Sequence, residues 1–262
     1  MKVRRNIQPE FLFRYASIAC VTLLVFTSGC SRPDAPWCLM RAGDWKTDTL
    51  TWNAPSSFAL AVNDHLEVEC IIGTSNEVQL VWSGPANLLA HTSAVWSGSE
   101  LVLNHEDRCQ WARNLSHVVH AKITAPQYDI VQLNGQGNFN LNYSNPTQDL
   151  EVDAQDYAGT IDLELALDSA TVKLHNGAAQ ALVTGNVRTF QGYSSGLSSL
   201  DASAFTADYA FIHQSGVSSL SFKATEYAYV IIDASGDAMG GYNQPVYWQF
   251  NQLGSGQLYW HY

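Results

Sequence analysis

The sequence predicts an all-β protein built as a single-domain β-solenoid with about 20 residues per coil. Three observations support this prediction. Short runs that alternate apolar and polar residues recur from about residue 48 onward. Six glycines in the second half are spaced by 22, 18, 19, 20 and 20 residues, and a Ser-Gly motif surrounds the last three of them. A coil of this length cannot bury its apolar side alone, so it becomes stable by stacking on its neighbours.

Four alternating runs predict strands in the first half of the domain. They lie at residues 65–72, 77–82, 99–104 and 118–123. Turn-forming residues, such as Gly73-Thr74-Ser75-Asn76, separate these runs. The segment 84–90 is the one place where we expect a short helical turn.

The recurring glycines predict one sharp turn in every coil, because glycine reaches a positive φ angle without steric cost. Two of these turns read Ser195-Gly196-Leu197-Ser198-Ser199-Leu200 and Ser215-Gly216-Val217-Ser218-Ser219-Leu220. A β-sandwich is the alternative fold, but it does not explain one motif at a constant interval. The solenoid would contain roughly ten coils, each adding about 4.8 Å. The predicted turn glycines are Gly137, Gly159, Gly177, Gly196, Gly216 and Gly236.

The N-terminal segment predicts export and attachment to a lipid. A basic start is followed by an apolar stretch at residues 15–26, which is too short to span a bilayer because spanning takes about 20 residues. Thr27-Ser28-Gly29-Cys30 resembles the lipobox of bacterial lipoproteins, with Thr27 where Leu is usual. The resemblance implies cleavage after residue 29 and acylation of Cys30, whereas an ordinary secretory signal is the alternative. We therefore expect a lipoprotein signal peptide at 1–29, a lipidated Cys and tether at 30–47, and the β-solenoid domain at 48–262.

The charge balance restricts the partners of the exported protein. The net charge is −11, and removal of residues 1–29 would lower it to −14, since four basic residues and one acid would leave. A chain this acidic has no footprint for nucleic acid phosphates, so we expect no nucleic acid partner. Contact with the membrane would depend on the lipid at Cys30, because anionic head groups repel the domain.

Three cysteines remain in the exported part beyond Cys30, namely Cys38, Cys70 and Cys109. An oxidising envelope permits one disulfide, and Cys70–Cys109 is the favoured pair because Cys38 lies in the tether. Buried free thiols are the alternative.

The sequence holds no constellation typical of an active site, so we expect no catalytic residues, no metal and no cofactor. It contains no C-x-x-C pair. His117 and His120 are close in sequence, but residues three apart on a strand point to opposite faces, which argues against a shared metal. Acids in the ranges 149–156 and 162–168 alternate with apolar residues, as on a solvated strand face. Lys173 and Arg188 are the nearest bases.

Aromatic residues offer the candidate binding surface. Tyr209 and Tyr229 are twenty residues apart, which would place them at the same position of consecutive coils. On stacked strands their rings would lie about 5 Å apart and form a ladder. An exposed ladder would stack on sugar rings, whereas a half-buried ladder would only stabilise the stack. The aromatic-rich C-terminal segments at 247–250 and 258–262 are interpreted as a cap on the last coil.

The chain also resembles the head GIN domain family of proposed auto-transporter adhesins over about residues 50–262. The resemblance rests on the order of several short motifs, including Lys122-Ile123-Thr124-Ala125-Pro126, Leu133-Asn134-Gly135-Gln136-Gly137 and Gly240-Gly241-Tyr242-Asn243-Gln244-Pro245. It implies a right-handed β-helix-like superhelix without recognised catalytic residues, and adhesion as the role.

We therefore expect a non-enzymatic lipoprotein of the cell envelope, anchored through Cys30, with the outer membrane favoured because no Asp follows that cysteine. It would display the solenoid for adhesion or for contact with a glycan or a protein. A polysaccharide-active enzyme on a β-helix is one alternative, which an acid–base constellation on one face would support. A periplasmic accessory protein without an external ligand is the other.

Overall fold

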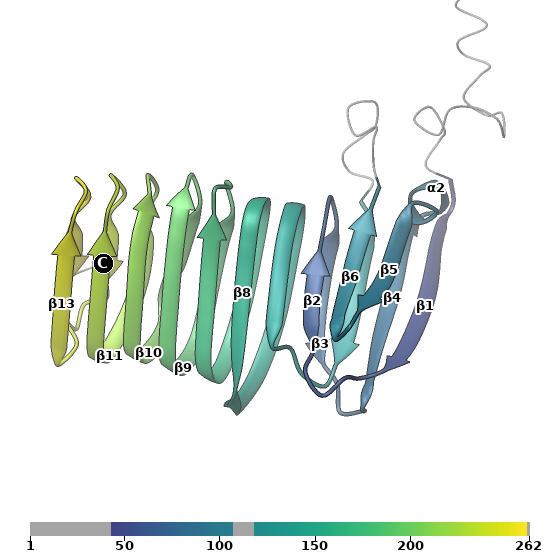
Figure 1. The fold of residues 1–262 in the computed structure, drawn as a ribbon, viewed down its shortest axis with the longest axis horizontal. Helices are drawn as coiled ribbons and strands as arrows, with labels where there is room; N and C mark the ends of the chain where they lie inside the picture. Colours follow the sequence, from purple (N-terminus) through teal and green to yellow (C-terminus); the bar gives the residue numbers. More distant parts are fainter. Residues whose placement is uncertain (1–42, 107–117, 261–262) are drawn as a thin grey trace, which may run out of the picture.

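A computed structural model describes residues 43–106 and 118–260 and confirms the β-solenoid (Figure 1). Of these described residues, 74% are in strands and 2% in helix, and the coils stack in about five turns of about 20 residues each. The expected number of coils, roughly ten, was therefore too high. The first part of the domain accounts for the difference, because it uses antiparallel strands in addition to regular coils.

The N-terminal end of the solenoid combines antiparallel and parallel strands. β1 (Trp45–Asn53) pairs antiparallel with β4 (Glu77–Pro85), and β4 pairs antiparallel with β7 (His120–Ala125). β7 then pairs in parallel with β3 (Glu67–Ile72), which continues into the solenoid. A short helix, α2 (Ala86–Leu89), follows β4 as the sequence predicted. β1 begins at Trp45, ahead of the expected domain boundary at residue 48.

A second group of strands covers the other side of this end. β5 (Thr92–Ser97) pairs antiparallel with β6 (Glu100–His105), and β6 pairs in parallel with β2 (Ala59–Val62). β2 in turn pairs in parallel with the start of β8 (Ile130–His175). The alternating runs that predicted strands at 65–72, 77–82, 99–104 and 118–123 correspond to β3, β4, β6 and β7 and are confirmed.

The remaining coils are continuous parallel strands that bend around the core. They are β9 (Gln180–Gly196), β10 (Ser199–Gly216), β11 (Leu220–Ile232), β12 (Ala238–Gly240), β13 (Tyr247–Gln252) and β14 (Leu258–Trp260). Their segments stack in two layers. We call layer A the stack of residues 169–174, 187–195, 207–214 and 227–232 with β13. Layer B contains residues 160–165, 180–185, 199–201 and 220–222 with β12 and β14.

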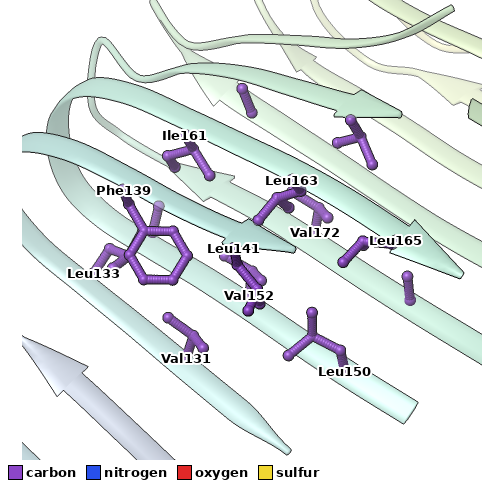
Figure 2. Packing of buried hydrophobic residues seen from close by; sticks show 14 of the residues in the cluster. Val131, Leu133, Phe139, Leu141, Leu150, Val152, Ile161, Leu163, Leu165 and Val172 are labelled. Carbon is purple, nitrogen blue, oxygen red and sulfur yellow. The ribbon is translucent and has the colours of Figure 1, made fainter. Parts of the chain in front are cut away.

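The core lies between the layers and follows directly from the alternation in the sequence. Figure 2 shows inward side chains such as Leu141, Ile161 and Val172 meeting in the interior. Because parallel strands stack in register, equivalent inward positions form columns along the solenoid. One such column is Ile161, Ala181, Leu200, Leu220 and Ala238, none of which is more than 4% exposed.

The six predicted turn glycines lie at the corner where the chain passes from layer A to layer B. Gly159 stacks on Gly137 of the preceding coil. A Cβ added to Gly159 would lie 1.9 Å from the carbonyl oxygen of Gly137. In the later coils, the backbone N–H of Leu197 donates a hydrogen bond to the carbonyl oxygen of Gly177. In the same way, the N–H of Val217 donates to the carbonyl of Gly196, and that of Gly236 to the carbonyl of Gly216. A positive φ, the predicted reason for glycine, holds at Gly137, Gly159 and Gly196. At the other three glycines the reason is close backbone contact, since a Cβ would lie within 2.9 Å of a carbonyl oxygen.

Candidate ligand-binding face

The outward surface of layer A near the C-terminal end carries five aromatic side chains in two columns. Tyr209 pairs in register with Tyr227, which pairs in turn with Tyr247. The next outward column pairs Phe211 with Tyr229. We call these five residues, on β10, β11 and β13, the aromatic face.

The predicted ladder of Tyr209 and Tyr229 is wrong in its pairing. Tyr209 lies opposite Tyr227, eighteen residues on, and Tyr229 lies opposite Phe211. Layer B keeps the twenty-residue interval, with Leu200 opposite Leu220. Register shifts between the two layers shorten the coil by two residues, so a constant interval does not hold on layer A.

The aromatic face is partly exposed. Tyr209 and Phe211 have exposed fractions of 42% and 41%, and Tyr247 reaches 72%, whereas Tyr227 and Tyr229 are half-buried. Phe211 also contacts Tyr227 diagonally, with ring centroids 6.1 Å apart. The rings therefore support one another on one edge and leave their outer surfaces accessible to a ligand.

A second group of rings adjoins the aromatic face toward the middle of the solenoid. Tyr193 lies between two histidines, with its ring centroid 4.7 Å from that of His175 and 5.2 Å from that of His213. Lys173, Tyr193 and His213 are register partners on β8, β9 and β10. This stack holds the three rings side by side across consecutive coils.

A groove of about 290 Å³ lies between the ring stack and the aromatic face. Its lining includes Lys173, His175, Tyr193, Phe211, His213 and Tyr229. These residues are far apart in the sequence, and the parallel register brings them together. Rings dominate the lining, while the lysine and the histidines supply polar edges.

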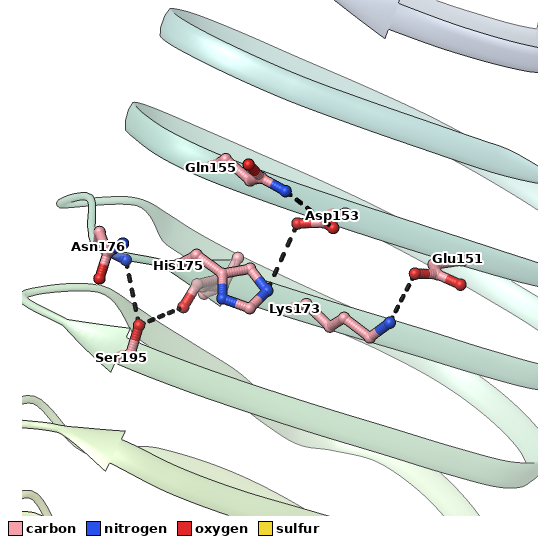
Figure 3. A network of polar contacts seen from close by, with 8 residues as sticks. Glu151, Asp153, Gln155, Lys173, His175, Asn176 and Ser195 are labelled. Atoms are coloured by element: carbon pink, nitrogen blue, oxygen red, sulfur yellow. Dashed lines mark hydrogen bonds and ion pairs between the residues drawn. The ribbon is translucent and has the colours of Figure 1, made fainter. Parts of the chain in front are cut away.

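Each basic group on this surface has an acidic partner (Figure 3). Lys173 Nζ lies 2.6 Å from Glu151 Oε1, and His175 Nε2 lies 3.6 Å from Asp153 Oδ1. His213 Nε2 lies 2.8 Å from Asp233 Oδ2. These contacts join successive coils and help to fix the side chains that line the groove, and Glu151 also neutralises the charge of Lys173.

A bidentate pair lies beside the aromatic face. Arg188 donates from Nε and from a terminal nitrogen to the two carboxylate oxygens of Asp168, both at 2.7 Å. These hydrogen bonds lower the pKa of Asp168 and raise that of Arg188. The hydrogen bond with His213 likewise lowers the pKa of Asp233, with a smaller contribution from Ser215. Both carboxylates are therefore ionised at neutral pH.

A larger groove, of about 850 Å³, lies on layer B. Carboxylates and amides dominate its polar lining, where Asn142 Nδ2 donates to Glu164 Oε2 at 2.6 Å. Asp162 and Glu164 are exposed, as the alternation predicted. No aromatic ring is among the described residues that line this groove, so it offers little for stacking.

The remaining predicted site residues are distributed as follows. Cys70 is a buried, free thiol whose pKa is raised by desolvation. Cys109, Cys30 and His117 lie outside the described residues, so the lipid attachment stays a prediction and the pairing of Cys70 with Cys109 stays untested, although Cys70 itself carries a free thiol in the structure. His120 pairs with Glu67 at 2.9 Å. Within residues 43–106 and 118–260, no group of three or more metal-ligating side chains is present, and no helix has the length and apolar character needed to cross a membrane.

Sequence reasoning missed the ring stack and the Phe211 column. Tyr193 and His213 are twenty residues apart, so a search at the spacing of the glycines would also have found this pair. Tyr227 and Phe211 gave no comparable signal, because the shortened coil hides their register.

The fold and the aromatic face together define a β-solenoid protein with a partly exposed aromatic surface on one layer. Residues 58–240 match the family model described as "Putative auto-transporter adhesin, head GIN domain". The chain belongs to this family, as its short motifs indicated. An adhesin family of this kind points to the cell envelope or surface.

Solved structures share the fold at low sequence identity. A "putative adhesin" from Bacteroides fragilis aligns with a TM-score of 0.69 and 15% identity, covering 83% of this chain and 97% of that one. A "putative adhesin" from Parabacteroides distasonis gives 0.58 and 12%, covering 84% and 98%. A "putative lipid binding protein" from the same organism gives 0.55 and 15%, covering 82% and 97%. No curated protein sequence matches the chain.

Proposed function

We propose that this chain is a non-enzymatic envelope lipoprotein that displays its β-solenoid and contacts an external ligand through the aromatic face. The gathering of five outward rings on three neighbouring strands carries the proposal. Large exposed apolar groups in one place add nothing to the core, and such patches mark interaction sites. Aromatic side chains are also the residues that contribute most at recognition surfaces.

The position of the aromatic face supports display. Residues that precede Trp45 would tether the domain through Cys30, at the end of the solenoid formed by β1 (Figure 1). The aromatic face spans β10, β11 and β13 near the opposite end. A lipid anchor at one end thus leaves the rings at the end farther from the membrane, where an external ligand reaches them.

The carboxylates that pair with the basic side chains favour a binding role over catalysis. Lys173, the base that a polysaccharide lyase would need, is held by Glu151 at 2.6 Å. The family match to adhesin heads agrees with this assignment. The structure named for lipid binding shares the same fold, and its name suggests that a solenoid of this kind can serve ligand binding.

The test is binding of the full chain to a printed array of neutral glycans, acidic glycans and collagen. We expect binding that falls in the double variant Phe211→Ala/Tyr229→Ala and persists in Tyr242→Ala, a matched control at a tyrosine that is 77% exposed outside the face. Labelling of intact cells should reach the domain, and Cys30→Ala should release it from the membrane. Release of new reducing ends that stops with Lys173→Ala or Asp153→Asn would contradict the proposal.

A further inference from the structure

The column that contains Phe211 and Tyr229 has amides at both ends. Gln191 is the register partner of Phe211 on one side, and Gln249 is the register partner of Tyr229 on the other. Both glutamines are exposed, and no described hydrogen bond within the protein uses either side chain. Two stacking rings therefore lie in line between two amides, each of which offers both donors and an acceptor.

The size of the groove favours a small ring-shaped group. At about 290 Å³ it lies at the lower limit of typical ligand pockets, which run from roughly 300 Å³ upward. The groove lies on an outer layer of the solenoid, so a bound ring can belong to a longer chain that continues across the coils. The Tyr209, Tyr227 and Tyr247 column runs parallel to the groove and offers further rings.

The charges of the groove select the ligand further. The basic side chains in its lining, Lys173, His175 and His213, each face a carboxylate. An anionic ligand would have to displace these carboxylates, and it would also meet a chain with a net charge of −11. A neutral ligand meets neither cost.

We infer that the groove between the His175–Tyr193–His213 stack and the aromatic face binds one unit of a neutral glycan. Phe211 and Tyr229 would stack on the apolar face of the sugar ring, and Gln191 in the groove lining would hydrogen-bond its hydroxyl groups. Gln249 lies one strand beyond Tyr229 and would contact the next unit of a longer glycan. The inference rests on the proposed function and specifies its ligand. A lipid is a poorer fit, since anionic head groups need unpaired cations and an acyl chain needs a deep apolar cavity.

The experiment is calorimetric titration of the full chain, held in neutral detergent, with galactomannan, xyloglucan and chitin oligosaccharides. Polygalacturonate, heparin and phosphatidylglycerol vesicles are titrated in parallel. We expect binding to at least one neutral polymer, weakened about fivefold to tenfold by Phe211→Ala or Tyr229→Ala. Gln191→Ala should weaken it too, and Tyr242→Ala should leave it unchanged. Circular dichroism of each variant confirms that the fold is kept.

Two groups of results would overturn the inference. Binding to polygalacturonate, heparin or vesicles that equals or exceeds binding to every neutral polymer would show that the ligand class is wrong. Neutral binding that survives Phe211→Ala, Tyr229→Ala and Gln191→Ala would place the glycan elsewhere. If an acidic glycan or collagen binds and the ring variants abolish this binding, the inference fails while the proposed function stands. If the ring variants change binding to none of the ligands, both fail.

Discussion

His213 Nε2 lies 2.8 Å from Asp233 Oδ2, so a ring of the groove is fixed by a carboxylate from the next coil. This hydrogen bond lowers the pKa of Asp233 below its ordinary value of 3.8. A group whose pKa is depressed by folding contributes stability above its unfolded pKa and loses it as the pH falls through the folded value. The contribution is therefore complete at neutral pH and is lost only in strong acid.

We predict that Asp233→Asn lowers the free energy of unfolding at pH 7 by at most about 1 kcal/mol, because both partners are about one-third exposed. The difference from the wild type should shrink as the pH falls below 3.8 and vanish below the lowered pKa of Asp233. Urea unfolding of both proteins at pH 7 and across the acid range measures this. A difference that grows as the pH falls below 3.8 would contradict the prediction.

Two phenylalanines on layer A differ in location, since one belongs to the core and the other to the aromatic face. Phe190 is 1% exposed and packs edge-on against Phe205 at 5.1 Å, whereas Phe211 is 41% exposed. We predict that Phe190→Ala lowers the free energy of unfolding by about 3–5 kcal/mol, because it leaves a cavity. Phe211→Ala should change it by no more than about 0.5 kcal/mol. Denaturant titration measures both values, and comparable losses would show that the outer ring is part of the core.

Cys70 provides a test of the predicted disulfide. Its thiol is buried at 2% exposure, and burial raises its pKa, so the reactive thiolate is scarce. We predict that iodoacetamide at pH 8 leaves Cys70 unmodified in the native chain and alkylates it after unfolding in denaturant without a reductant. Peptide mass spectrometry identifies the modified residue. Alkylation that requires a reductant would instead show that Cys70 is in a disulfide, and peptide mapping without reductant would identify whether Cys109 is its partner.

The fold was predictable because its signals are local and repeated. The alternation at 65–72 specifies β3 with Val68 and Cys70 inward, and the spacing of Gly196, Gly216 and Gly236 specifies stacked corners. Such patterns are independent of how distant segments pair, so they survive in a single sequence.

The face could not be predicted in detail because register depends on irregularities. Two shifts between Asp201 and Tyr209 shorten one coil, and they move Tyr227 instead of Tyr229 opposite Tyr209. The recurrence of a positive φ at this corner was hidden because several corner residues are not glycine. The positive φ of Gly196 is also adopted by Asp64, Asp156 and Asn176. Asp and Asn tolerate this conformation, so a search for glycines alone misses these corners.

The stacked glycines provide a test of why the corner excludes side chains. Gly159 has a positive φ of 156°, and an added Cβ would lie 1.9 Å from the carbonyl oxygen of Gly137. Gly98 also has a positive φ, 65°, but nothing lies within 4 Å of its Cβ position. We predict that Gly98→Ala lowers the free energy of unfolding by about 1–2 kcal/mol, the cost of the backbone conformation alone.

Gly159→Ala should lower the free energy of unfolding by at least about 4 kcal/mol, because the coils must separate locally in addition to the conformational cost. Thermal and urea unfolding of the two variants measure the difference, which contains the steric cost at Gly159 together with the higher conformational cost of a φ of 156° for alanine. Equal losses in both variants would mean that the coils relax around a methyl group at no expense. Close backbone stacking would then not be the reason that glycine occupies this corner.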